Sequence, residues 1–236
     1  MSSVVLSSVA LACTACGGGD DENQPGAASR AIEPAANARA EAVVLKLSDF
    51  PDGWRASAPD ADDEADQRKF RECVGVDYSD LTTTGEAESQ DFAMGESMDV
   101  SSEARVFETE AEATSSLSEF ADGMASDAVE GCIEALVEDS AETDQDFTVG
   151  EVDVGELSFT PPDVDEARAW QIAIPIEVTS GQAKGVSATV YLDIVDLREG
   201  DTIVSVQTSD VLTPFDASLR RELVEKVAIR MSADSG

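Results

Sequence analysis

The chain has 236 residues, 42% of them hydrophobic, and its 50 acidic side chains against 15 Lys and Arg give a formal net charge of −35. This length and hydrophobic content suit one packed domain and exclude a chain that is disordered throughout. The charge repels nucleic acid and anionic lipid headgroups, so we expect no nucleic-acid partner. Because histidine is absent, Ser-His-Asp and Cys-His catalytic systems, HExxH zinc sites and histidine pH switches are excluded.

The first sixteen residues carry no charged side chain and form an apolar segment that ends at two cysteines. The apolar run 4–12 is too short to span a bilayer as a helix. Residues 11–22 place Cys13 and Cys16 before Gly-Gly-Gly-Asp-Asp-Glu, and this arrangement resembles the signal and lipobox of a bacterial lipoprotein. In that family the cysteine thiol receives a diacylglyceryl group and becomes the new N-terminus. The resemblance implies lipidation at Cys16, with Cys13 as the alternative.

One feature departs from a secretory signal, because residues 1–10 contain no Lys or Arg. Either the true start codon lies upstream of Met1, or this segment is not a signal. Because the lipobox motif is short, a secretory peptide with soluble release is the alternative to a lipid anchor. Two acyl chains would hold the protein firmly on a membrane, whereas one chain binds only marginally. Residues 17–37 are rich in Gly, Ala, Asp, Asn and Pro and show no apolar period, so they predict a flexible acidic tether with a reach of roughly 25 Å.

With two cysteines assigned to the export signal, Cys73 and Cys132 remain. Two cysteines in an exported chain most simply form one disulfide. Closing a loop of about 60 residues stabilises a fold by roughly 3–4 kcal/mol. A metal pair is the alternative, but two thiols without histidine make a poor zinc site. We therefore expect a disulfide, no metal and no cofactor.

The folded domain is predicted to span residues 38–233 and to open with a helix over 38–47. A Pro-Asp-Gly turn ends this helix. Phe50 and Trp54 flank the turn and are candidates for stacking on a ligand, although aromatic residues beside such a turn more often close the edge of a core.

An acidic run at 60–66 precedes a basic and aromatic helix over 67–74 that carries Cys73. The run alternates like an EF-hand but lacks the turn glycine and the bidentate glutamate, so a solvated loop is favoured over a calcium site. Residues 77–97 show no period and predict a long loop. A strand is predicted over 98–108, because Val100, Ser102, Ala104 and Val106 recur at every second position. Helices over 110–124 and 126–138 follow.

From residue 146 onward the apolar residues recur with period two. Glycine turns connect the resulting strands as hairpins, which predicts an antiparallel meander with one face buried, over residues 147–159, 170–178, 186–194 and 203–211. Trp170 and Tyr191 lie on these strands and are further candidates for the wall of a ligand cleft. Pro175 predicts an edge position or a bulge. A last helix, capped by Thr213, should cover the sheet.

This order of elements looks like that of secreted actinobacterial lipoproteins and of the extracellular sensor domain attached to some mycobacterial Ser/Thr kinases. Residues 50–54, Cys73, residues 107–132 and the hairpin at 198–201 carry the resemblance. It implies an antiparallel sheet, covering helices, disulfides and a cleft that binds a ligand. The kinase sensor has two disulfides where this domain can form one, and no binding residue transfers by motif.

The chain is therefore predicted to be an exported α+β domain, held outside the cytoplasm on the cell membrane by a lipid. We expect a binding or sensing module whose partners are the membrane and either a small ligand or an envelope protein. A carrier of lipid or another apolar molecule, or a structural envelope lipoprotein, is the alternative. A hydrolase using Asp193 and Asp196 is disfavoured, because their odd spacing puts them on opposite faces of a strand.

Overall fold

The computed structural model describes residues 33–59, 63–76, 81–95, 97–144, 147–159, 163–180 and 184–234. Cys13, Cys16 and the predicted signal lie outside the described residues. The elements are α1 (Pro34–Val43), a 3-10 helix η1 (Leu47–Asp49), β1 (Arg55–Ser57), α2 (Asp63–Val74), β2 (Thr83–Glu88), β3 (Asp91–Met94), β4 (Met98–Phe107), α3 (Glu110–Met124), α4 (Val129–Asp144), β5 (Phe147–Val149), β6 (Asp153–Glu156), β7 (Glu166–Val178), β8 (Ser187–Glu199), β9 (Thr202–Val211) and α5 (Ala217–Asp234).

The strands form one antiparallel sheet in the order β1-β3-β4-β9-β8-β7-β5, with β2 pairing β4 and β6 pairing β7. The long strands β7, β8 and β9 follow one another as a meander, and β9 then pairs with β4. The β8–β9 hairpin turns at Gly200 and Asp201. The predicted α+β fold with an antiparallel sheet and covering helices is confirmed.

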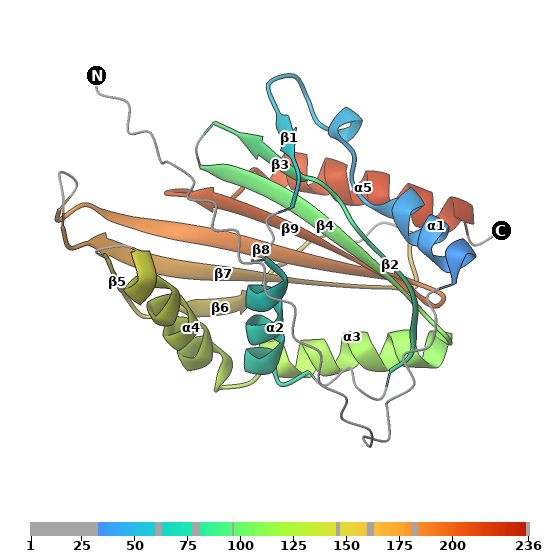
Figure 1. Ribbon diagram of the computed structural model, residues 1–236, viewed down its shortest axis with the longest axis horizontal. Helices are drawn as coiled ribbons and strands as arrows, with labels where there is room; N and C mark the ends of the chain where they lie inside the picture. The colour runs from blue at the N-terminus through green and yellow to red at the C-terminus, as the bar shows by residue number, and fades with distance from the viewer. Residues whose placement is uncertain are drawn as a thin grey trace, which may run out of the picture.

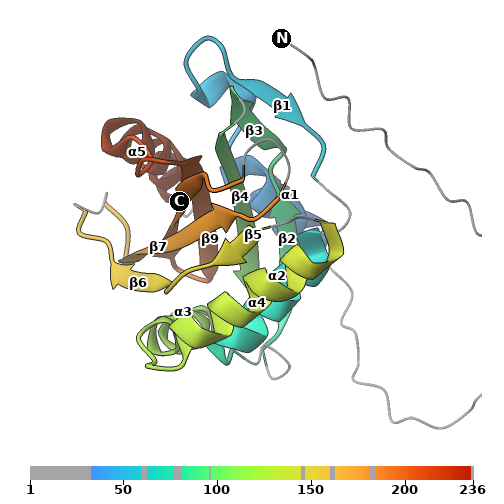
Figure 2. The same cartoon turned by 90° about the vertical axis from the view of Figure 1, so that its left-hand side faces the viewer.

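Helices cover both faces of this sheet (Figures 1 and 2). The helices α1 and α5 lie on one face, and α2, α3 and α4 lie on the other. Each face has its own hydrophobic core: Phe92 and Leu223 belong to the first, and Phe120 and Ile172 to the second. The prediction of one buried face is therefore wrong. In β8 the successive residues 193–198 are all buried, although neighbours along a strand point to opposite faces.

The first helix begins at Pro34, four residues before the predicted start, because proline fits the first turn of a helix. The predicted loop at 77–97 is also wrong, since β2 and β3 lie within it. Strand β2 runs directly beneath α1. A Cβ on Gly85 would lie 2.3 Å from the carbonyl carbon of Ala36, so only glycine permits this approach.

Several element ends differ from the predictions. Helix α5 begins at Ala217, and the carboxylate of Asp216 caps it by accepting from the backbone N–H of Leu219 at 2.8 Å. The predicted cap at Thr213 is wrong. The chain is not helical before residue 217, and Phe215 in this irregular stretch is buried. On one edge, β7 pairs with β6 before Pro175 and with β5 after it. Pro175 lies in the gap between these two paired stretches, a position that suits a residue without a backbone N–H.

The predicted disulfide is confirmed. Cys73 of α2 and Cys132 of α4 are joined, with a Cα–Cα distance of 5.5 Å and 59 positions between them in the sequence. The crosslink therefore fixes two helices on the same face of the sheet. Within the described ranges, no helix is both long enough and apolar enough to cross a membrane.

Candidate functional site

A cavity of about 380 Å³ lies between the sheet and the helices α2, α3 and α4. The strands β4, β8 and β9 form its floor, with Ser101, Glu103, Arg105, Phe107, Leu192, Ile194, Asp196, Ile203, Ser205 and Gln207. The helices form its roof, with Phe70, Arg71, Ser116, Leu117, Phe120 and Leu136. Most of the polar lining is thus on the floor, and most of the roof is apolar.

The alternation of strand β4 positions the floor. Its even-numbered residues, such as Val100 and Val106, are buried in the core beneath α1 and α5. Its odd-numbered residues therefore point the other way. Those that line the cavity are Ser101, Glu103, Arg105 and Phe107. The alternation of Val100, Ser102, Ala104 and Val106 that predicted this strand marks the face opposite the site. The odd-numbered residues between them contribute polar side chains to the cavity lining.

Three polar side chains line up across the floor. Asp196 of β8 lies opposite Ser205 of β9, and Ser205 lies opposite Glu103 of β4. Burial raises the pKa of Asp196 to about 7, and the negative charge of Glu103 acts in the same direction. A hydrogen bond from the Ser205 hydroxyl and the positive charge of Arg105 lower the pKa, but by less than burial raises it. Asp196 therefore changes its charge near neutral pH.

An ion pair adjoins this row. Arg105 Nη2 lies 2.5 Å from Glu103 Oε1, and both residues belong to β4. They are two positions apart and so share the cavity face. Their side chains are only 16% and 19% exposed, which protects the pair from screening by solvent.

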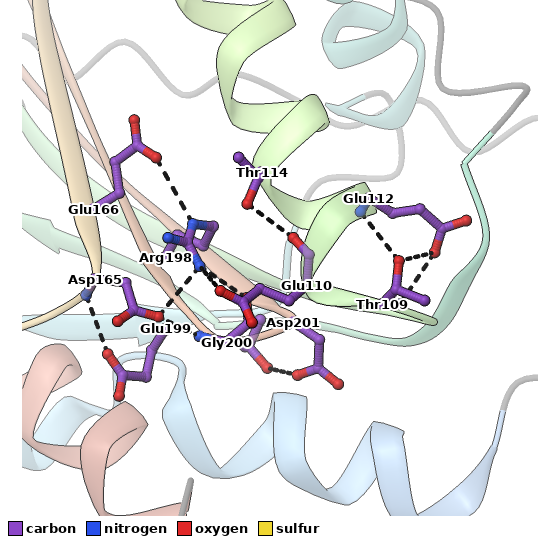
Figure 3. A network of polar contacts seen from close by, with 11 residues as sticks. Thr109, Glu110, Glu112, Thr114, Asp165, Glu166, Arg198, Glu199, Gly200 and Asp201 are labelled. Atoms are coloured by element: carbon purple, nitrogen blue, oxygen red, sulfur yellow. Dashed lines mark hydrogen bonds and ion pairs between the residues drawn. The ribbon is translucent and has the colours of Figure 1, made fainter.

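A polar network fixes the first turn of α3, which carries part of the roof (Figure 3). Thr109 and Glu112 form a reciprocal capping box at its N-terminus. The guanidinium of Arg198, at the end of β8, lies 3.2 Å from Asp165 Oδ2 and 3.6 Å from Glu110 Oε1. Because Glu110 is the first residue of α3, these contacts hold the helix against the sheet.

The helix α2 is held at its C-terminal end. The Cys73–Cys132 disulfide joins it to α4. A Cβ on Gly123 would lie 1.9 Å from the carbonyl oxygen of Val74, so a glycine in α3 lets the last residue of α2 come this close. Phe70 of α2 lies one turn before Cys73 and lines the cavity. The disulfide thereby positions part of the roof.

The other face of the sheet holds different charges. Asp193 of β8 is 1% exposed and forms an ion pair with Arg220 of α5. Gln171 of β7 donates a hydrogen bond to the same carboxylate at 2.8 Å. Asp193 therefore lies under α5 while Asp196 lines the cavity, so the two carboxylates occupy opposite faces as their spacing predicts.

The predicted cleft aromatics lie outside the cavity lining. Phe50 and Trp54 stack at 4.7 Å between ring centroids in the core under α1 and α5. Trp170 is buried and packs edge-on against Phe120 at 5.2 Å, so it supports a lining ring from behind. Tyr191 is half-buried on the strand face of Asp193. The aromatic rings that line the cavity are Phe70, Phe107 and Phe120.

Sequence reasoning missed the polar floor. Glu103, Arg105 and Ser205 stand between apolar residues of predicted strands, where a polar residue usually faces solvent. Asp196 lies beyond residue 194, the predicted end of its strand. The sequence does contain one signal for these residues: in the strand predicted over 98–108, Glu103 and Arg105 carry opposite charges two positions apart.

Among the described residues, no group of three or more Cys, Asp or Glu side chains is arranged to hold a metal ion.

No family model matches the chain, and no curated protein matches it. Among solved structures, the extracellular domain of PknH from Mycobacterium tuberculosis matches with a TM-score of 0.43 and 11% identity, over 86% of this chain and 99% of that chain. A putative uncharacterized protein, the Rv0999 ortholog from Mycobacterium smegmatis, matches with a TM-score of 0.35 and 15% identity, over 78% of this chain and 92% of that one. The first is a mycobacterial kinase extracellular domain, the class that the sequence resembles. At these identities and TM-scores, neither likeness carries an argument about function.

Proposed function

We propose that this chain is an exported binding module, tethered to a membrane by its N-terminal segment, that holds a small ligand in the cavity between the sheet and α2, α3 and α4. The observation that carries the proposal is the cavity itself, of about 380 Å³, with polar groups on its floor and a mainly apolar roof. Concave sites with a few convergent polar groups in apolar surroundings are typical of small-molecule binding.

Two features support export. The Cys73–Cys132 disulfide belongs to a class of crosslink that persists in oxidising compartments and is rare in the cytosol. Residues 11–22 resemble a lipobox, and acylation at Cys16 would then provide the tether. Intact-mass measurement of the native protein tests this: we expect cleavage before Cys16 and the added mass of a diacylglyceryl group. An uncleaved, unmodified chain would refute the tether.

The charges on the floor favour binding of a ligand with a polar part over transport of a wholly apolar molecule. An apolar cargo lying across Asp196 and the Glu103–Arg105 pair would remove water from these groups without replacing its hydrogen bonds, which is costly. Binding is also favoured over catalysis, because the chain has no histidine and Asp193 lies on the opposite face from Asp196.

A cavity-filling variant tests the proposal directly. Ser116 of α3 is buried and lines the cavity, whereas Ser118 of the same helix is exposed. Native mass spectrometry of the protein purified from its own host should reveal a bound small molecule. We expect Ser116→Trp to lose that molecule and the matched control Ser118→Trp to retain it.

Circular dichroism and intact mass confirm that both variants fold and keep the disulfide. Retention of the molecule by folded Ser116→Trp would overturn the assignment to this cavity. Should Ser116→Trp fail to fold, Gln207→Trp on β9 fills the same space from the floor. Recovery of acyl chains without any polar headgroup would instead support the carrier function.

A further inference from the structure

One carboxyl group stands out on the floor of the cavity. Asp196 is 5% exposed and lines the cavity from the C-terminal part of β8. It receives a hydrogen bond from Ser205, its cross-strand neighbour on β9. Among the roof residues that line the same cavity, Leu117 and Phe120 are apolar and Arg71 carries a positive charge.

The other charged groups that line the cavity come from two elements. The strand β4 supplies Glu103 and Arg105, which bind each other. The helix α2 supplies Arg71. The residues that α3, α4 and β9 contribute to this lining contain no titratable group. Glu103 engages Arg105 directly, so the attraction of Arg105 for Asp196 is shared with a second carboxylate.

We propose, on the basis of the function proposed above, that the ligand of this cavity is an organic ammonium with an apolar body, whose cationic head binds beside Asp196 while its body packs under the roof. A buried carboxylate is costly unless a cation pairs with it, and a ligand ammonium would supply that cation. The rings of Phe70 and Phe120 also line the cavity, and a cation is attracted to the face of an aromatic ring. The net charge of −35 draws cations toward the protein and repels anions.

Binding of this kind releases a proton. In the free protein burial raises the pKa of Asp196 to about 7, so at pH 6 the carboxyl is mostly neutral. A bound ammonium lowers that pKa, because an opposite charge at close range favours the ionised form. The neutral carboxyl and the ammonium thus become an ion pair, and the carboxyl proton passes to the buffer.

Isothermal titration calorimetry with octylamine, octanol and octanoate separates the possible head groups. An alkylammonium keeps its charge across this range, as lysine does with a pKa of about 10.4, so any pH dependence reports the protein. If only the ionised Asp196 is competent, octylamine binds about tenfold more tightly at pH 8 than at pH 6. Buffers of different ionisation enthalpy should then show about 0.9 proton released per octylamine bound at pH 6. Octanol should show neither effect.

Variants on the floor identify the group. Asp196→Asn keeps the shape of the side chain and should bind octylamine and octanol equally, without pH dependence. Asp99→Asn removes one exposed charge from β4 outside the cavity lining and should behave as wild type. Ser205→Ala removes a hydrogen bond that lowers the pKa of Asp196, so the pH profile for octylamine should shift upward, an effect that loss of packing would not produce.

Two results overturn the inference. If octanol or octanoate binds as tightly as octylamine at pH 8, the cavity does not select a cation, although it still binds a ligand. If Asp196→Asn retains the pH dependence, another group is responsible. Failure of the binding function itself has a different signature: none of the three probes binds, and the protein purified from its host carries no small molecule.

Discussion

Removal of the Cys73–Cys132 disulfide should lower the free energy of unfolding by about 4 kcal/mol. The crosslink closes a loop across 59 positions of the sequence. The loss of loop-closure entropy in the denatured chain grows with the logarithm of that number and amounts to about 4 kcal/mol at 25 °C. A domain has only roughly 5–15 kcal/mol of net stability, so this loss is a large fraction of the total.

The disulfide also acts on the cavity. It joins α2 to α4, and α2 contributes Phe70 and Arg71 to the roof. Because Phe70 lies one turn from Cys73, release of the crosslink should let this part of the roof move away from the sheet. We therefore expect the reduced protein to bind any ligand of the cavity more weakly, even where it remains folded.

Urea unfolding, followed by circular dichroism, measures the effect. For a slope of about 2 kcal/mol per M, a loss of 4 kcal/mol moves the midpoint down by about 2 M. The comparison uses the oxidised protein, the same protein in dithiothreitol and the Cys73→Ser/Cys132→Ser double variant. Addition of dithiothreitol to the double variant is the control and should change nothing.

Unfolding of the reduced protein and the double variant at the midpoint of the oxidised protein would refute the predicted loss of stability. The denatured chain would then gain no freedom from loss of the crosslink. A drop in midpoint with unchanged ligand binding would refute only the effect on the roof, since α2 would then stay in place through its packing against α3 and α4.

Three further predictions concern other parts of the fold. Arg220→Met leaves buried Asp193 without its cation and should lower stability by about 3–5 kcal/mol in urea unfolding; the double variant Asp193→Leu/Arg220→Met should regain most of this loss, and additive losses would contradict the pairing. Gly85→Ala should lower the thermal midpoint, with a cost of about 1–3 kcal/mol, because its Cβ would overlap the backbone of Ala36; an unchanged midpoint would show that α1 can shift. The pKa of Asp196 is raised to about 7 in the folded state. The folded chain therefore keeps a proton that the unfolded chain loses above about pH 4. As a result, the free energy of unfolding falls with rising pH by up to about 1.4 kcal/mol per pH unit until pH 7. Asp196→Asn should remove this component, which denaturant titrations from pH 4 to 8 would detect, and identical slopes for both proteins would refute it.

Elements with a strong period and a clear start could be predicted from the sequence. The bounds predicted for α3 agree with the structure, because its apolar residues recur at helical spacing. Alternation and glycine turns predict the strands β7, β8 and β9, but β7 begins four residues earlier than predicted and β8 continues five residues further, to Glu199. The disulfide followed from the number of cysteines left once Cys13 and Cys16 were assigned to the export signal.

The missed elements depend on contacts that no local pattern records. In β2, Gly85 packs directly under the backbone of α1, and the inner side of the strand carries small residues. Small residues give little alternation between apolar and polar positions, so the sequence pattern does not indicate a strand. The start of α5 is set by the burial of Phe215 beside Trp54, which keeps the preceding turn irregular. In both places a tertiary contact decides a local structure.

Two buried carboxyl groups of β8, those of Asp193 and Asp196, lie on opposite faces of the sheet and have different surroundings. On one face, the carboxylate of Asp193 binds Arg220 and so joins the sheet to α5. On the other face, the carboxyl of Asp196 lines a cavity whose roof is mainly apolar and includes Arg71. An interlayer ion pair can be explained by cohesion alone, because it holds a helix in place. A buried carboxyl at a cavity adds no such contact and costs stability above its pKa. A cationic ligand, as proposed above, would offset this cost by pairing with the carboxylate.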